Sequence, residues 1–100
     1  MRPIHLAAID KTRPVLVLTR EQVRPYLNSV TVAPITSAVC GLSTEVPVGK
    51  ANGLDHDSVV SCDNIVTVPG SAIGKLIGYL PPAQEEALAR AIAAAFDLDL

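Results

Sequence analysis

Apolar residues occur along the chain in short runs that are separated by polar residues, glycines and prolines. Runs of this kind, bounded by turn-forming residues, are typical of β-strands. The run at residues 15–18 is uninterrupted, which predicts a strand buried on both faces, whereas residues 44–48 alternate as a half-exposed strand does. The pattern predicts strands at residues 4–9, 13–18, 30–35, 44–48, 58–62, 64–68 and 73–80.

The connections between these runs indicate a largely antiparallel sheet. Residues 10–12 leave room only for a hairpin between the first two predicted strands. Asp63 interrupts two later runs and predicts a bend or bulge between them. Thr19 and Gln22 have the spacing of a helix cap, but Pro25 limits any helix there to a turn or two.

The repeat of apolar positions lengthens to four residues near the end of the chain. Leu88, Ile92 and Phe96 follow this spacing and predict one apolar helix face that packs on the sheet. Pro82 is well placed to begin the helix, which is predicted to run from there to about Phe96. The predicted fold class is mainly β with α: a small, barrel-like sheet with a C-terminal helix, in a single domain of residues 1–100.

The amino-acid composition predicts that the protein binds a partner. Hydrophobic residues make up 49% of the 100 residues, and the mean hydropathy of +0.37 is high for so short a chain. Some apolar surface is therefore expected to be buried against another molecule, and a second copy of the chain is the simplest choice. No apolar run reaches the ~18 residues of a membrane span, and the first residues lack a signal-peptide pattern. Two cysteines predict no disulfide framework, and both are expected to be small buried side chains of a cytoplasmic protein.

Charge is distributed unevenly, although the net charge of −2 argues against a general nucleic-acid coat protein. Residues 1–25 carry five basic and two acidic residues, a local charge of +3. The remaining residues carry three basic and eight acidic ones, a local charge of −5. A basic region on an acidic molecule can attract an anionic ligand. The count by itself favours a solvated basic edge without a ligand.

Motifs for nucleotide and metal binding are absent from the sequence. It contains no phosphate-binding glycine loop, and His5, His56, Cys40 and Cys62 lack the close spacing of zinc ligands. The sequence therefore predicts neither a cofactor nor a metal site. His56, with an aspartate on either side, lies in a glycine-bounded loop, where a solvated turn is the more common arrangement.

Polar side chains lie at the ends of two strongly apolar predicted strands. Lys11, Thr12 and Arg13 lead into the second strand, and Thr36 and Ser37 follow the third. If these strands are antiparallel neighbours, the two polar ends meet, and an arginine fork beside hydroxyl donors suits a phosphate group. Residue types alone favour a structural role, because arginines and hydroxyls are common at strand ends.

Four segments, taken in order, resemble a known family of toxins. They are RPVLVL at residues 13–18, VAPITS at 32–37, GL at 53–54 followed by SVVSCD at 58–63, and IGYL at 77–80. Each segment alone has little specificity. In this order and spacing the set resembles the MazF/PemK toxin family over nearly the whole chain.

The resemblance implies an SH3-like barrel of the CcdB/PemK type, a homodimer, and a metal-independent, sequence-selective endoribonuclease that cleaves single-stranded RNA and inhibits translation. The implied reaction is attack of a ribose 2′-hydroxyl on the adjacent phosphate, which leaves a 2′,3′-cyclic phosphate and a 5′-hydroxyl. Position by position, Arg13 and Thr36 match the family's catalytic pair, and Ser37 lies beside them. The implied partner, besides RNA, is a cognate antitoxin whose acidic, disordered tail fills the RNA groove.

Residue chemistry divides the roles within this expected site. An arginine guanidinium stays protonated at neutral pH, so Arg13 is expected to clamp the phosphate rather than to move a proton. Thr36 is expected to be an orienting donor. No general base is assigned, and His5 is the only candidate that we expect near this end of the sheet. The expected RNA-binding residues are Lys11, Thr12, Ser37, His5 and Lys50.

The chain departs from the family pattern at several positions, and two other classes of protein stay open. The connection at residues 10–12 is shorter than the loop that commonly covers the family's active site, and Val66 and Ala72 stand where many relatives have arginine. Fewer basic residues predict a shallow salt dependence of RNA binding. The alternatives are a CcdB-like toxin that binds a topoisomerase through the acidic and apolar residues 96–100, and a catalytically inactive regulatory barrel.

Overall fold

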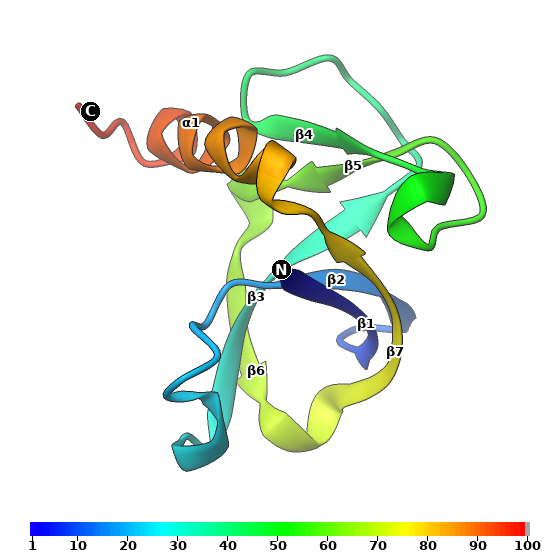
Figure 1. Ribbon diagram of the computed structural model, residues 1–100, viewed down its shortest axis with the longest axis vertical. Helices are drawn as coiled ribbons and strands as arrows, with labels where there is room; N and C mark the ends of the chain where they lie inside the picture. Colours follow the sequence, from blue (N-terminus) through cyan, green and yellow to red (C-terminus); the bar gives the residue numbers. More distant parts are fainter. Residues whose placement is uncertain (100) are drawn as a thin grey trace.

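A curled antiparallel sheet with one helix packed across it makes up the computed structural model, which describes residues 1–99 (Figure 1). The sheet has the order β4-β5-β3-β2-β1-β7, and β6 pairs with β3 away from this path, so the strands form the barrel-like fold that the apolar pattern predicts. No helix of these residues is long and apolar enough to cross a membrane. The elements are β1 (Arg2–Ala8), β2 (Thr12–Val17), β3 (Ser29–Thr36), β4 (Glu45–Val48), β5 (Ser58–Ser61), β6 (Val66–Pro69), β7 (Ile73–Leu80) and α1 (Glu85–Ala95).

β2 is buried on both faces, as its uninterrupted apolar run predicts. Val15 and Val17 are at most 1% exposed and pack in a cluster with Val68 of β6. Leu16 packs in a second cluster, which includes Leu88 of α1. Each buried side chain of this size contributes about 1.5–3 kcal/mol. A slip of one residue would exchange the two faces of β2, so this burial fixes its register against β1 and β3.

β3 connects the two halves of the sheet because it pairs with three neighbours in succession. Its residues 29–32 pair with β6, residues 32–34 pair with β2, and residues 35–36 pair with β5. In the described part of the chain β5 and β6 do not pair with each other, and a 3₁₀ turn at Cys62–Asn64 joins them, which confirms the predicted bend. Pro34, which has no N–H for a ladder, lies on β3 where β5 and β6 separate.

α1 is shorter than its apolar spacing predicts. A 3₁₀ turn at Pro82–Gln84 replaces the expected first turn, and the helix ends at Ala95. Leu88 is buried as predicted. Phe96 is not: its side chain is exposed, because it follows the last helical residue, and the prediction that it belongs to the buried face is wrong. The apolar tail considered for protein binding ends at Leu100, which lies outside the described residues.

The two cysteines have different environments, so the prediction that both are buried is correct for only one. Cys62 is buried, and this burial, followed by the negative charge of Asp63, raises the pKa of its thiol to about 11. Cys40 is exposed in the loop between β3 and β4. The backbone N–H of Cys40 donates to the carboxylate of Glu45 at 3.2 Å, which holds this loop in a surface turn and leaves the sulfur outside the core.

Candidate active site

Arg13 and Thr36 lie side by side on neighbouring antiparallel strands. β2 and β3 pair with Val15 opposite Pro34, and two further residues in the same register bring Arg13 opposite Thr36. The two polar strand ends noted in the sequence therefore meet at one end of the β2–β3 pair. Arg13 and Thr36 both line two adjoining hollows in the surface.

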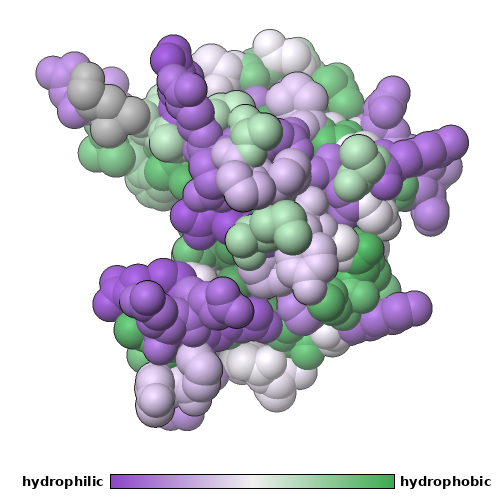
Figure 2. Space-filling view, in the orientation of Figure 1, coloured by the Kyte–Doolittle hydropathy of each residue, from purple (hydrophilic) through white to green (hydrophobic). Residues whose placement is uncertain are grey.

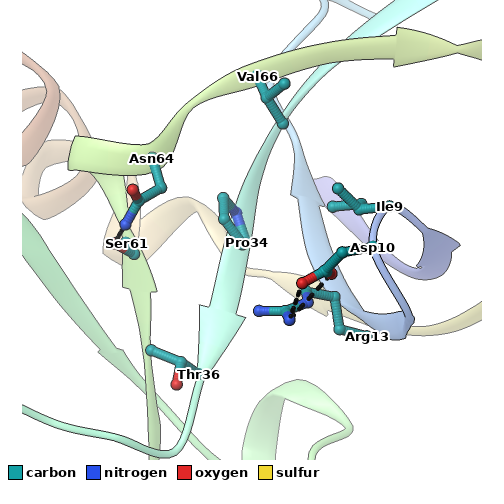
Figure 3. Close-up of a pocket in the computed structure, with 8 residues that line it drawn as sticks. All are labelled: Ile9, Asp10, Arg13, Pro34, Thr36, Ser61, Asn64 and Val66. Carbon is teal, nitrogen blue, oxygen red and sulfur yellow. Dashed lines mark hydrogen bonds and ion pairs between the residues drawn. The ribbon is translucent and has the colours of Figure 1, made fainter.

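The first hollow has a volume of about 550 Å³ and lies where β5 and β6 separate along β3. Figure 3 shows its residues, which come from the β1–β2 turn, β2, β3, the end of β5, the 3₁₀ turn that follows it and the start of β6. The side chains of Ser61 and Asn64 are joined by a hydrogen bond of 2.8 Å on one side of it. The lining residues are Ile9, Asp10, Arg13, Pro34, Thr36, Ser61, Asn64 and Val66.

The second hollow, of about 270 Å³, lies between the start of β2, the end of β3 and the loop that precedes β5. It brings basic, hydroxyl and imidazole groups to the same surface as Arg13. Its polar and charged lining residues are Lys11, Arg13, Thr36, Ser37, Asp55, His56 and Ser58.

Asp10 holds the guanidinium of Arg13 from the β1–β2 turn. Nη2 of Arg13 lies 3.0 Å from each carboxylate oxygen of Asp10. The N–H of Lys11 donates to the same carboxylate at 2.8 Å, and this hydrogen bond is the main cause that lowers the pKa of Asp10, ahead of the charges of Arg13 and Lys11. The carboxylate is therefore ionised at neutral pH and orients the guanidinium.

The Nε atom of Arg13 is buried and has no hydrogen-bond partner within residues 1–99. A buried donor without a partner costs about 1–3 kcal/mol. Planar guanidinium donors match the oxygens of a phosphate. Since Nε itself is closed to solvent, an anion in either hollow reaches Arg13 through the exposed part of its side chain.

The hydroxyl of Thr36 is oriented by the chain that follows it. Its Oγ1 accepts a hydrogen bond of 3.1 Å from the N–H of Ala38. This bond uses the oxygen as an acceptor and leaves the hydroxyl proton available for donation. Thr36 can thus donate to an anion that Arg13 also binds.

The other expected RNA-binding residues are divided between the hollows and the rest of the surface. Lys11 and Ser37 line the second hollow. Thr12, at the start of β2, lines neither hollow. The Nδ1 atom of His5 lies 2.9 Å from a carbonyl oxygen of β7, and Lys50 begins a 3₁₀ turn before β5. Neither His5 nor Lys50 is brought to Arg13 and Thr36.

Six polar residues of the site were not predicted: Asp10, Asp55, His56, Ser58, Ser61 and Asn64. Asp10 had a detectable signal, because a residue three positions before Arg13 in a tight hairpin turn is within reach of its guanidinium. The others come from segments distant in the sequence, and only the pairing of β3 with both β2 and β5 brings them here. His56 lies in an exposed bend, as the sequence predicts for this loop, and it also lines the second hollow.

The basic residues of the first quarter of the chain do not form one patch. Arg20 and Arg24 belong to the segment between β2 and β3, which follows the opposite end of β2 from Arg13. Figure 2 shows hydrophilic residues gathered at the lower left, where that segment lies in Figure 1. Arg2 forms a salt bridge of 2.9 Å with an acidic residue of α1. Of the five basic residues, Lys11 and Arg13 line the hollows.

The fold and the site together define a small β-barrel protein in which an arginine and hydroxyl groups meet at two adjoining hollows. No group of three or more His, Cys, Asp or Glu side chains that could hold a metal ion occurs in the part of the chain that the structure describes. Residues 4–96 match the family described as PemK-like, MazF-like toxins of type II toxin–antitoxin systems. The chain therefore belongs to the MazF/PemK toxin family.

Individual relatives agree with this assignment over the full length. The chain is 65% identical over 99 residues, 99% of its own length and 96% of the relative's, to Endoribonuclease MazF3 of Mycobacterium tuberculosis. Its fold superposes on that of Mycobacterium tuberculosis toxin MazF-mt6 with a TM-score of 0.98, at 64% identity and with 99% and 100% of the two chains covered. At this similarity the activity class is shared, and the chain is an endoribonuclease.

A more distant solved structure supports the fold alone. It is described as an endoribonuclease in complex with its cognate antitoxin from a mycobacterial species. It matches with a TM-score of 0.87 at 21% identity, covering 98% of this chain and 94% of its own. The half-barrel with its C-terminal helix is therefore retained where most residues differ.

Proposed function

We propose that this endoribonuclease cleaves single-stranded RNA without a metal ion, by attack of a ribose 2′-hydroxyl on the adjacent phosphate. The products are a 2′,3′-cyclic phosphate and a 5′-hydroxyl. The observation that carries the proposal is that Arg13 and Thr36 line the same two hollows, with the guanidinium of Arg13 held by Asp10 and the hydroxyl proton of Thr36 free to donate. The hollows, of about 550 and 270 Å³, are large enough for a phosphate and its ribose.

In this mechanism Arg13 stabilises the negative charge that develops on the phosphoryl oxygens. Its guanidinium is already fixed by Asp10, so little reorganisation is needed when the phosphate arrives. Thr36 donates to a second oxygen and orients the phosphate for attack. A well-placed donor of this kind contributes on the order of 3 kcal/mol to the transition state. Lys11 and Ser37, which line the second hollow, would hold the neighbouring phosphates.

The proposal limits the RNA-binding surface to the two hollows and their rim. His5 and Lys50 are not part of it, because neither lines a hollow. The single domain would carry the whole catalytic site. The acidic tail of a cognate antitoxin would compete with RNA for Lys11 and Arg13 of the same hollows.

A homodimer is also part of the proposal. β7 lies at one end of the sheet order and carries Leu76 and Tyr79, which are more than two-fifths exposed. Apolar side chains along an edge strand are typical of surfaces that a second copy covers. Because translation is the expected target, the proposal locates the protein in the cytoplasm.

The experiment that tests this function follows RNA cleavage in excess EDTA. We expect single-stranded RNA to be cut, with 2′,3′-cyclic phosphate on the upstream fragment and a 5′-hydroxyl on the downstream one. A matched RNA with 2′-deoxyribose at the cleaved position lacks the nucleophile and should resist cleavage entirely. Fragments that carry 5′-phosphates, or cleavage that stops in EDTA, would contradict the proposed chemistry.

A further inference from the structure

The proposed reaction requires two proton transfers, and the pair Arg13 and Thr36 supplies neither a base nor a ready acid. The 2′-oxygen must lose a proton as it attacks phosphorus, and the 5′-oxygen must gain one as it leaves. Arg13 stays protonated, and a threonine hydroxyl is too weak a base at neutral pH. The carboxylate beside them, Asp10, already accepts from Arg13 and from the N–H of Lys11 with its two oxygens, so the base is sought in a further side chain at the same surface.

His56 brings an imidazole to the second hollow, where Arg13 and Thr36 also lie. Imidazole is the side-chain group whose ordinary titration range falls between about pH 5 and 8, which suits it to general-base catalysis. The other histidine, His5, is held on β1 against β7 and lines neither hollow. Within residues 1–99 His56 is thus the imidazole that lies beside the phosphate-binding pair.

The segment that carries His56 is fixed at both ends. On one side, Leu54 is buried and its N–H donates to the carbonyl oxygen of Gly49 at 3.2 Å. On the other side, Ser58 is buried and its hydroxyl donates to the carbonyl oxygen of His56 at 3.0 Å. The backbone of His56 is therefore held at a constant position relative to the hollow, while its side chain stays exposed to substrate.

A buried amide anchors this segment to the rest of the fold. Asn52 is 4% exposed, and its Nδ2 donates to the carbonyl oxygen of Tyr79 at 3.0 Å and to Oε1 of Gln84 at 2.9 Å. Its Oδ1 accepts from the N–H of Gly49 at 3.0 Å. The turn before His56 is in this way tied to β7 and to the start of the helix. Such support is characteristic of functional side chains on loops.

We propose that His56 is the general base of the reaction, an inference that rests on the function proposed above. Its neutral imidazole takes the proton of the 2′-hydroxyl. The 2′-oxygen forms the new bond to phosphorus, the bond from phosphorus to the 5′-oxygen breaks, and that oxygen keeps the electron pair. The 5′-oxygen then gains a proton from water, and the imidazolium returns its own proton to water.

The charged groups around His56 suit this role. Lys11 and Arg13 approach the second hollow from the start of β2, where their charges can hold the phosphate beside the imidazole. Asp55 lines the same hollow from the His56 segment. The carboxylate of Asp57 lies against Gly49. No charged group of another element is placed at this hollow within the described residues.

The test compares the pH dependence of RNA cleavage in the wild-type protein with that of His56→Ala and His56→Gln proteins. We expect wild-type kcat/KM to rise with pH over the histidine range and then level off. Both variants should lose this rise and fall about 10²- to 10⁴-fold at the plateau. Added imidazole should restore part of the rate of His56→Ala. The His5→Gln protein should keep the pH-dependent rise, whatever its rate.

An RNA substrate with a bridging sulfur in place of the 5′-oxygen shows whether His56 acts as a base or as an acid. Its thiolate leaving group departs without a proton, so this substrate needs no general acid. As a base, His56 is still needed for this substrate, so His56→Ala should stay slow on it. Full recovery of His56→Ala on this substrate, or variants within threefold of wild type with the pH-dependent rise intact, would overturn the assignment. Wild-type protein that yields no cyclic phosphate would instead contradict the proposed function itself.

Discussion

At the scale of single residues, the site depends on hydrogen-bonding groups that are oriented but not saturated. Nη2 of Arg13 donates to Asp10, while Nε of Arg13 has no partner within the described residues. Oγ1 of Thr36 accepts from the N–H of Ala38, while the hydroxyl proton of Thr36 is free to donate. Such groups cost stability in the free protein. This arrangement is characteristic of a site organised in advance for developing charge.

Thr36 offers a direct residue-scale prediction. Thr36→Val removes the hydroxyl at nearly constant volume, and we expect kcat for RNA cleavage to fall about 10²-fold, as for loss of one transition-state donor. Thr36→Ser keeps the hydroxyl and should retain activity to within about tenfold. Single-turnover kinetics with both proteins measure the difference. Equal rates for the two variants would show that the hydroxyl does not donate in the transition state.

Residue-scale reasoning from sequence succeeded where local chemistry and strand position coincide. Arg13 and Thr36 stand at the ends of apolar strands, so their meeting could be predicted from the hairpin-like order alone. His56 could not be weighed correctly, because nothing in a polar loop indicates what the loop packs against. Its place depends on the burial of Leu54 and on the bonds of Asn52, both of which are tertiary.

At the scale of elements, two backbones cross closely near the active site. A Cβ added to Gly78 of β7 would lie 1.8 Å from the carbonyl oxygen of Asn52, and one added to Gly53 would lie 2.0 Å from that of Ile77. Gly53 also has a φ of 90°, which disfavours other residues. The glycines thus permit the approach that holds the turn before His56 against β7.

Gly78→Ala should disrupt this crossing. Because the added methyl meets backbone rather than a flexible side chain, we expect the free energy of unfolding to fall by about 1–3 kcal/mol or more. RNA cleavage should fall with it, since the His56 segment loses its support. The matched control is Gly70→Ala, whose Cβ would lie an ordinary 3.4 Å from its nearest neighbour. Urea denaturation measures the free energy of unfolding of both proteins. Equal values for Gly78→Ala and Gly70→Ala would contradict the close crossing of the two backbones.

The boundaries of β2 and β7 were predicted well, because the apolar runs and the turn-forming residues beside them indicate the same ends. The three successive partners of β3 were not predictable, because pairing between distant strands leaves no local pattern. The first hollow arises from that pairing, at the gap where β5 and β6 separate. The position of the site was thus predictable from sequence, but its shape was not.

At the scale of the whole molecule, an acidic protein presents a site with few basic groups. The net charge is −2, and the hollows contain two basic side chains, Lys11 and Arg13, and two acidic ones, Asp10 and Asp55. Arg20 and Arg24 lie beyond the far end of β2, and Val66 contributes no charge to the first hollow. RNA binding should therefore depend on shape and hydrogen bonding more than on accumulated charge.

This charge distribution predicts a shallow salt dependence. With two phosphate contacts per site, the logarithm of the association constant should fall with the logarithm of salt concentration with a slope of about −1.4. Fluorescence anisotropy with an uncleavable 2′-O-methyl RNA measures this slope. The Lys11→Gln protein should bind with a slope smaller by about 0.7. A slope of about −4 or steeper, as for six contacts, would contradict the proposed size of the binding surface.

The central claim is that Arg13 clamps the scissile phosphate, and one measurement tests it most directly. The rate of RNA cleavage in excess EDTA is compared among wild-type, Arg13→Lys and Arg13→Ala proteins, with circular dichroism and Tm to verify folding. We predict that Arg13→Ala folds normally and loses cleavage by at least about 10³-fold, whereas Arg13→Lys, which keeps the charge but not the planar fork, falls between. Folded Arg13→Ala protein that cuts RNA at the wild-type rate would contradict the account.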